Sequence, residues 1–279
     1  MKLSIIIIHY KNKQRLTTCL NSINKIELNK EIIIIDNNSN DNIEDSLKTY
    51  NNVIYIQNKT NLGFSRGCNQ GVKIAQGSHL LFLNPDTIVP ENTLQMCLNF
   101  YSETTNIGLL GVKMLNENGI FLKESARGMP DPLTSLFKLC KINMMFPKSK
   151  IFNKYYLGHL DKTKNQEIKI VAGAFMMVSK NIINEINGFD EKFFLFGEDI
   201  DISIRTSKKG YKNYYLAETY ITHIKGESMK KNWKYIFHFY NSMMIFIKKY
   251  YFALIFIAWP VVYTMMFLHY IKYFLFNKN

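Results

Sequence analysis

Three carboxylates within four positions, Glu198, Asp199 and Asp201, are the strongest candidates for chemistry in the sequence. They follow four apolar residues at 193–196, with Gly197 between the two groups. A helix is expected to begin after this apolar run, because Asp201 and Arg205 have the spacing of an i,i+4 ion pair. The helix dipole favours a charged carboxylate in the first turn, whereas burial beside phenylalanine raises its pKa. A general base needs such tuning; the alternative is that the three acids only complement the helix dipole.

Further polar side chains stand where predicted strands end. Asp36 follows an isoleucine-rich run at 31–35, and Asp86 follows an apolar run at 79–83. An aspartate in a proline turn usually serves the turn, but one that closes a core strand beside another such strand favours a metal or phosphate role. His223, near the end of a later strand, is a suitable companion for Asp86, since metals take mixed imidazole and carboxylate ligands.

The first third of the chain alternates short apolar runs with helical patterns. Strands are predicted at 3–8, 31–35, 53–57 and 79–83, and helices near 16–23 and 43–50. This order predicts an α/β fold with a parallel sheet and right-handed crossovers. Ligands of such sheets bind at the carboxyl ends of the strands, which places His9, Tyr10 and Asp36 at the expected site.

Glycines at 63, 67 and 71 recur every four residues and would share one face of a helix. Each costs helix stability, about 1 kcal/mol relative to alanine, so something is expected to approach this face closely. One interpretation is close packing of the helix on the sheet. The other is a ligand that approaches the polar side chains of the same segment, Asn61, Arg66 and Asn69.

The later elements follow a less regular pattern. Pro90 is expected to open a helix whose buried face includes residues 94, 97, 98 and 101. Segments 109–115 and 120–122 are predicted to be antiparallel strands, and 132–146 a helix or lid. A buried strand is predicted at 168–178, a helix capped by Ser179 and ending at Gly188, and strands at 213–216 and 220–224 before a polar loop at 223–228.

The 279-residue chain has a net charge of +13, and the positive charge is concentrated near its end. From Arg205 onward, 12 Lys and Arg face 2 Glu. The longest run without Asp, Glu, Lys, Arg or His, at 250–268, lies in the same quarter. Basic and apolar residues together indicate an anionic membrane surface, whereas the absence of zinc-finger spacing or an RNP-like motif argues against nucleic acid.

The uncharged run of 19 residues only just reaches the length of a bilayer span, and Pro260 interrupts it. It predicts a helix or helical hairpin seated at the membrane interface rather than spanning it. The alternative is an amphipathic helix that docks in a homo-oligomer.

The cysteines at 19, 68, 97 and 140 are widely spaced. Those at 19, 68 and 97 lie inside predicted helices and indicate buried small hydrophobic residues in a reducing compartment rather than disulfides or a metal site. The start of the chain has only a short apolar run, at 5–8, and no pattern of a signal peptide.

Seven motifs in order resemble the inverting glycosyltransferases of family 2 with the GT-A fold, especially the rhamnosyltransferase-like branch. They occupy residues 4–12, 36–41, 61–71, 83–86, 173–177, 188–201 and 223–228. The resemblance covers roughly residues 3–228. It implies a GT-A domain at 1–228, with a nucleotide-sugar-binding half at 1–115 and an acceptor-binding half at 116–228. Residues 229–279 would form a basic and apolar, membrane-associated helical tail.

The resemblance also implies roles for single residues. Asp36, beside His9 and Tyr10, would contact the pyrimidine base of the donor. Asp86 and His223 would hold Mg²⁺ or Mn²⁺ together with the donor diphosphate. Asn84 stands where the family's Asp-x-Asp element has its first aspartate, which leaves one strong ligand there. Further donor contacts are expected from the polar side chains named above, Asn61, Arg66, Asn69 and Asn84.

Asp199 resembles the general base that deprotonates the acceptor hydroxyl, with Glu198 as the second candidate. The implied reaction is metal-dependent, inverting transfer of a sugar to a glycan or lipid-linked glycan at the cytoplasmic side of the membrane, in cell-surface polysaccharide synthesis. The resemblance favours dTDP-rhamnose as donor, while UDP-linked hexoses and galactofuranose fit the same motifs. The alternative is a catalytically inactive sugar-nucleotide-binding or scaffold protein of a glycan assembly complex.

Overall fold

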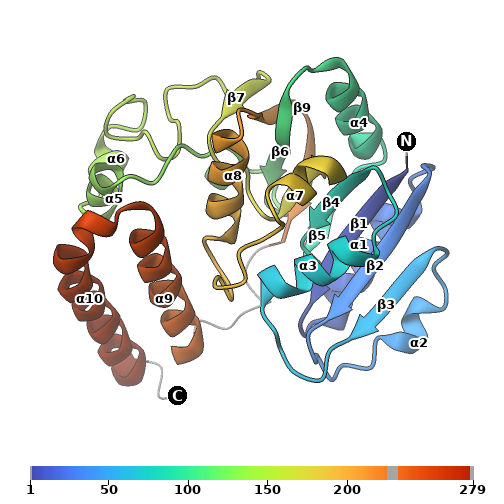
Figure 1. Cartoon of the computed structure of the whole chain (residues 1–279), viewed down its shortest axis with the longest axis horizontal. Coiled ribbons are helices and arrows are strands. Elements are labelled where there is room, and N and C mark those ends of the chain that lie inside the picture. Colours follow the sequence, from blue (N-terminus) through green and yellow to red (C-terminus); the bar gives the residue numbers. More distant parts are fainter. Residues whose placement is uncertain (1, 225–231, 277–279) are drawn as a thin grey trace.

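The structure, a computed structural model, describes residues 2–224 and 232–276. At its centre is a sheet with the strand order β3-β2-β1-β4-β8-β6-β9-β5, and β7 pairs with β9 outside that path. Figure 1 shows the sheet running through the molecule between helices. The strands are β1 (Leu3–His9), β2 (Lys30–Asp36), β3 (Val53–Gln57), β4 (His79–Leu83), β5 (Thr87–Ile88), β6 (Ile107–Leu115), β7 (Gln166–Ile168), β8 (Phe175–Ser179) and β9 (Lys212–His223).

The first four long strands form the parallel part of the sheet, as predicted. Strand β1 lies between β2 and β4 and is parallel to both, and β3 is parallel to β2. All seven residues of β1 are buried, and alternate side chains face two different core clusters. Burial on both faces explains why this strand reads as a continuous isoleucine run rather than an alternating pattern.

The second part of the sheet is mostly antiparallel and differs from the prediction in three places. Residues 120–122, predicted as a strand, form only an isolated antiparallel bridge between Phe121 and Leu115. The strand predicted at 168–178 is divided into β7, which pairs with β9, and β8, which pairs with β4 and β6. The strands predicted at 213–216 and 220–224 are one strand, β9. Its pairing with β6 jumps from Leu216 to Tyr220, so a bulge interrupts the register while the strand continues.

Helices cover the two faces of the sheet in two groups. Helices α1 (Lys13–Asn24), α2 (Glu44–Leu47) and α4 (Thr93–Glu103) contribute to one core cluster. Helices α3 (Phe64–Ile74), α7 (Lys180–Glu185) and α8 (Glu198–Lys208) contribute to the other. This is the two-sided packing expected of a doubly wound α/β fold.

Four helices differ from the prediction. The helix or lid predicted at 132–146 is divided into α5 (Pro132–Leu139) and α6 (Ile142–Met145). Helix α2 spans four residues instead of 43–50. Helix α4 begins at Thr93, so Pro90 is not its first residue; the Pro90 carbonyl accepts a hydrogen bond from Thr93 N (3.0 Å) in the turn before it. Helix α7 starts at its Ser179 cap as predicted but ends at Glu185, because the following chain turns through left-handed conformations at Asn187 and Gly188.

The repeated glycines of α3 serve close packing on the sheet. A Cβ atom at Gly71 would lie 2.4 Å from the Ile6 side chain of β1, and one at Gly67 would lie 3.0 Å from the Ile8 side chain. Of the two interpretations of this repeat, close helix–sheet packing is therefore confirmed for these two positions.

The last described helices form an antiparallel hairpin, α9 (Trp233–Tyr250) and α10 (Ile255–Phe276), joined by a short 3₁₀ turn (Phe252–Leu254). Figure 1 shows this hairpin beside α8 and below α5 (Pro132–Leu139) and α6 (Ile142–Met145). Among the described residues, one helical stretch, Phe252–Leu275, has the length and composition of a membrane span. The predicted boundary at residue 228 and part of the polar loop at 223–228 lie outside the described residues.

Three of the four cysteines, Cys19, Cys68 and Cys97, are buried on α1, α3 and α4, as predicted. Burial raises the pKa of all three thiols. Cys140, directly after α5, is exposed.

Candidate functional site

Asp86 and His223 lie side by side because of strand pairing. The short strand β5 runs antiparallel to β9, with Thr87 opposite His223, and Ile224 N donates to the Asp86 carbonyl (2.9 Å). The Asp86 Oδ1 and His223 Nε2 atoms are 3.2 Å apart, and both side chains are about nine-tenths buried. Asp86 and His223, more than 130 positions apart in the sequence, are therefore neighbours in the fold. This agrees with the prediction that they could bind the same ligand.

The chemistry of this pair fits a divalent cation. Among the described residues, His223 Nδ1 is buried without a hydrogen-bond partner. The described part of the chain contains no group of three or more His, Cys, Asp or Glu side chains that could hold a metal ion. One carboxylate and one imidazole leave several positions of a divalent ion open for the oxygens of a bound diphosphate.

Asp199 lies at the same edge of the sheet, although it comes from helix α8. Its Oδ2 atom accepts a hydrogen bond from Gly173 N (3.2 Å). Gly173 comes shortly before Phe175, the first residue of β8, which pairs in register with Leu83 at the end of β4. Since β4 leads directly into Asp86, the Asp199 carboxylate and the Asp86–His223 pair stand at the same end of neighbouring strands.

A buried arginine, Arg127, forms an ion pair with Asp199. Its Nη2 atom also donates to the Val171 carbonyl (3.2 Å), which fixes the guanidinium beside the carboxylate. Burial, the largest single influence, lowers the pKa of Arg127, but the charge of and hydrogen bond to Asp199, together with Tyr155, outweigh it and raise the pKa overall. Arg127 was not predicted, because an isolated arginine between Ala126 and Gly128 carries no motif.

Glu198 and Asp199 have different surroundings although they are adjacent. Glu198 is buried, and its Oε2 atom has no hydrogen-bond partner among the described residues. Burial, and then the charge of Asp199, raise the pKa of Glu198 to about 8. Glu198 is therefore mostly protonated at neutral pH, which leaves Asp199 as the more suitable proton acceptor of the two.

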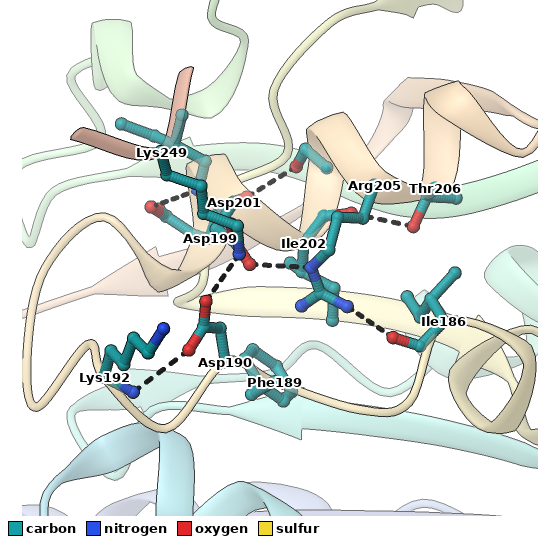
Figure 2. Close-up of polar contacts among 12 residues, drawn as sticks. Ile186, Phe189, Asp190, Lys192, Asp199, Asp201, Ile202, Arg205, Thr206 and Lys249 are labelled. Atoms are coloured by element: carbon teal, nitrogen blue, oxygen red, sulfur yellow. Dashed lines mark hydrogen bonds and ion pairs between the residues drawn. The ribbon is translucent and has the colours of Figure 1, made fainter. Parts of the chain in front are cut away.

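Asp201, the third carboxylate of the turn, has different partners from Glu198 and Asp199. It is completely buried and accepts a hydrogen bond from Arg205 Nε (2.7 Å), which confirms the predicted i,i+4 ion pair. Lys249 and Tyr250 of α9 also bind its carboxylate. Figure 2 shows Asp201 between Arg205 and Lys249, and Lys249 also pairs with Asp190. Asp201 is thus a structural carboxylate.

The strand-end residues of the first half are already engaged by neighbouring side chains. Asp36 Oδ1 accepts from Ser39 N (2.8 Å), and Asp36 Oδ2 accepts from Tyr55 Oη (2.9 Å). His9, in register with Asp36, is buried and pairs with Asp41 (2.9 Å). Their contact with a donor base stays a prediction, as does that of Tyr10, which is 36% exposed.

Asn69 and Arg66, two of the four polar residues predicted to bind the donor, make contacts within the protein. Asn69 Oδ1 accepts from Phe189 N (2.8 Å) and Asn69 Nδ2 donates to the Phe189 carbonyl (3.0 Å). Arg66 pairs with Glu191 at the surface (3.3 Å). Both residues tie α3 to the chain before α8, and their donor role stays a prediction.

Asn61 and Asn84 complete the predicted set. Asn61 Oδ1 accepts from Gly63 N (2.9 Å), which shapes the turn before α3. Asn84 is half-buried after β4, and its backbone N donates to the Ala174 carbonyl (3.0 Å). This bond links the chain before Asp86 to the chain beside Gly173, and the donor contacts of both asparagines also stay predictions.

Comparisons with known proteins agree with one another. A family model described as Glycosyl transferase family 2 matches residues 4–186, and one described as Glycosyl transferase family group 2 matches residues 149–277. The low-salt glycan biosynthesis hexosyltransferase Agl10 of Haloferax volcanii is 25% identical, over 74% of this chain and 62% of its own length. An N-acetylglucosaminyl-diphospho-decaprenol L-rhamnosyltransferase of Mycobacterium tuberculosis is 23% identical, over 71% of this chain and 67% of its own.

The solved structure of GalNAc-T7 with UDP, GalNAc and Mn²⁺ superposes on the chain with a TM-score of 0.67 at 18% identity. The match covers 94% of this chain and 51% of that chain. The chain thus spans about three fifths of the hexosyltransferase and half of the GalNAc-T7 chain.

Proposed function

The chain belongs to glycosyl transferase family 2, and on that premise we propose that it transfers a sugar from a nucleotide-diphosphate donor to a hydroxyl group of a glycan or lipid-linked glycan in cell-surface polysaccharide synthesis. Its fold is of the GT-A type, with a mostly parallel first half and an antiparallel extension. The division of the GT-A domain into donor and acceptor halves at residue 115 remains part of the proposal.

The observation that supports this function best is the convergence of Asp86, His223 and Asp199 at one end of the sheet. In the reaction, Asp199 accepts the proton of the acceptor hydroxyl, whose oxygen attacks the anomeric carbon. The bond from that carbon to the diphosphate oxygen breaks, and the nucleoside diphosphate leaves with its electron pair. A single attack from the opposite face inverts the anomeric configuration.

The other residues of the site support this step. Arg127 holds the Asp199 carboxylate in place through the ion pair. Asp86 and His223 would hold a divalent ion, Mg²⁺ or Mn²⁺, which supplies Lewis-acid stabilisation of the leaving diphosphate. The Mn²⁺ in the GalNAc-T7 structure supports a divalent ion in this fold. Asp36 with His9 and Tyr10 would form the base-binding end of the donor site.

Rhamnose from dTDP-rhamnose is the favoured sugar, because the mycobacterial relative is named as a rhamnosyltransferase. The name of the same relative describes an acceptor on a polyprenyl diphosphate, which supports a lipid-linked acceptor here.

The hairpin supports a location at a lipid surface. Large apolar side chains of α10 are exposed, among them Phe256 (84%) and Ile257 (70%). Together with the basic end of the chain, they favour an anionic membrane, which we place at the cytoplasmic side. Co-sedimentation with phosphatidylglycerol vesicles, and its loss in Phe256→Asp/Ile257→Asp, would support this location. A dimer in the absence of lipid, with no vesicle binding, would support the oligomer interpretation instead.

Sugar transfer by the Asp199→Asn variant tests the proposed function. With dTDP-rhamnose, UDP-hexoses and UDP-galactofuranose as donors, we expect kcat to fall about 10²- to 10⁴-fold, the range for loss of a general base. The Kd for the nucleoside diphosphate should change little, because the residue acts on the acceptor. The matched control is Asp161→Asn, which removes a half-exposed carboxylate outside the site and should leave turnover intact.

Two outcomes would contradict the proposal. Equal turnover of Asp199→Asn and Asp161→Asn would remove Asp199 as the base. Binding of nucleotide sugars without transfer or hydrolysis by the unaltered chain, with and without chelator, would favour the inactive binding or scaffold protein.

A further inference from the structure

Ion pairs and hydrogen bonds connect the end of helix α9 to the first turns of α8 and to the segment before it. We call the residues involved the Asp201 network: Asp190, Asp201, Arg205, Lys249 and Tyr250. Lys249 Nζ lies 2.6 Å from Asp201 Oδ1 and 2.5 Å from Asp190 Oδ2. Tyr250 Oη donates to Asp201 Oδ1 (2.6 Å). Figure 2 shows Lys249 between the two aspartates, with Arg205 on the other side of Asp201.

The network balances charge around a carboxylate that has no contact with solvent. Asp201 is 0% exposed, and the two carboxylates face two cations, Arg205 and Lys249. Arg205 also donates to the Ile186 carbonyl (2.6 Å), so it is held in place independently of α9. Removal of Lys249 would leave two acids to one cation, and a buried carboxylate that loses a partner is strongly disfavoured.

Helix α9 also contacts the segment that leads into α8. Ser242 Oγ donates to the Leu195 carbonyl (2.7 Å), and the His238 and Phe194 rings are stacked 4.3 Å apart. Phe196 has a φ of 67°, in the left-handed region that a bulky side chain rarely adopts. Such a conformation persists only when the surroundings hold it, and Tyr235 of α9 packs edge-on against the Phe196 ring (5.1 Å).

The first turn of α8 is therefore held from two sides. Asp199 is bound by Arg127 and by Gly173 N, which belong to the sheet side of the site. Asp201, two residues later, is bound by α9. On its other side α9 packs against α10, where Val262 is buried between the helices and Tyr240 Oη hydrogen-bonds to His269 Nδ1 (3.0 Å).

We propose that Lys249 is a positioning residue that ties the hairpin to the turn carrying Glu198 and Asp199, so that binding of the hairpin to a lipid surface orders the catalytic turn. The inference rests on the proposed function for its kinetic consequence. Its structural part, the coupling of α9 to the start of α8, stands separately. The lipid partner follows from the exposed apolar side chains of α10 and from the excess of Lys and Arg after residue 204.

Hydrogen exchange of the full chain tests the coupling without any reference to activity. In Lys249→Met, we expect amides of residues 198–206 to exchange about tenfold faster than in the unaltered protein, while those of β1 and β2 stay unchanged. Lys248→Met is the matched control, because it also removes one positive charge, at the neighbouring exposed lysine. Lys249→Arg keeps the cation and should restore slow exchange.

Kinetics test the functional part. We expect Lys249→Met to lower kcat about tenfold with the donor KM nearly unchanged, because a small displacement of the base affects the chemical step rather than donor binding. Phosphatidylglycerol vesicles should raise kcat of the unaltered chain and of Lys248→Met, but not of Lys249→Met. Phosphatidylcholine vesicles of the same size should have a smaller effect.

Equal exchange at 198–206 in Lys249→Met and Lys248→Met would overturn the coupling, whatever the chain catalyses. A vesicle response of Lys249→Met equal to that of the control would overturn the link to lipid. If Lys249→Met does not fold, Tyr250→Phe, which removes one hydrogen bond to Asp201, replaces it with the same expected order of effects. Absence of sugar transfer by every variant, with altered exchange in Lys249→Met, would reject the proposed function and leave the coupling in place.

Discussion

Backbone pairing places the polar side chains at the sheet edge, whereas side chains from distant segments place the carboxylates at the start of α8. His9 and Asp36 are in register on β1 and β2, and Thr87 pairs with His223 next to Asp86. The α8 turn instead depends on Arg127, Gly173 N and residues of α9. The sheet edge is thus fixed by many main-chain hydrogen bonds, and the α8 turn by a few ion pairs and hydrogen bonds from segments far apart in the sequence.

The two regions should also differ in how a substitution changes the stability of the fold. A side chain at a strand end can be replaced while the ladder that carries it persists, so its effect should stay local. At the start of α8, burial and the neighbouring charge of Asp199 raise the pKa of Glu198. Substitutions there should affect stability and pH dependence as well as chemistry.

Among the substitutions that test this difference, Glu198→Gln should have the largest effect, on the pH dependence of the unfolding free energy. The folded chain binds the Glu198 proton with a pKa of about 8, against 4.5 for the free side chain. This contribution to stability, on the order of a few kcal/mol, is fully present below about pH 4.5 and is lost as the pH rises to about 8.

Glu198→Gln should therefore show a flatter dependence of unfolding free energy on pH between 5 and 8 than the unaltered protein. Urea unfolding at several pH values measures the difference. Parallel pH curves for the two proteins would mean that Glu198 ionises freely in the fold, and the contrast between the two regions would lose its main support.

A smaller effect is expected at the sheet edge, where His223→Ala and Asp86→Ala should each weaken divalent-ion binding about a hundredfold or more. Removal of an outer-shell partner alone costs up to this amount, and these residues are the proposed ligands themselves. Calorimetry with Mn²⁺ and a nucleoside diphosphate measures the affinity. The matched control is His79→Ala, since His79 lies at the opposite end of β4. Equal losses in all three variants would point to general destabilisation rather than a metal site.

The smallest of these effects concerns the packing that supports the sheet edge. Gly71→Ala should destabilise the fold by about 2 kcal/mol, because the new methyl group would lie 2.4 Å from the Ile6 side chain. Gly67→Ala meets a longer contact, 3.0 Å to the flexible end of Ile8, and the gain in helix propensity of about 1 kcal/mol should offset it. Equal midpoints of thermal unfolding for the two variants would show that β1 adjusts to α3 more freely than the structure indicates.

The same contrast explains how much was predictable from the sequence. Asp36, Asp86 and His223 follow apolar strand patterns, and the topology of a parallel sheet then brings such ends together. The start of α8 after Gly197 was also predicted, from an apolar run followed by acidic residues and an i,i+4 pair. These features depend on local patterns and on the general rules of sheet topology.

Other features depend on pairings that no local pattern encodes. Arg127 and Asp199 are 72 positions apart, and Lys249 meets Asp190 at a separation of 59. The proximity of such partners is decided only when loops and the hairpin pack. The division of the strand predicted at 168–178 has a similar cause, because its two parts pair with different strands. The continuous apolar pattern does not reveal that change of partner.

Because three of the four thiols are buried and one is exposed, the chain can be labelled at a single cysteine. Cys19, Cys68 and Cys97 are shielded in the cores, so a maleimide reagent at neutral pH should modify Cys140 alone. The natural sequence thus provides a single attachment point, directly after α5, for a fluorophore or a spin label. Spectroscopy on the unmutated chain would then report how the segment after α5 responds when donor, cation or vesicles are added.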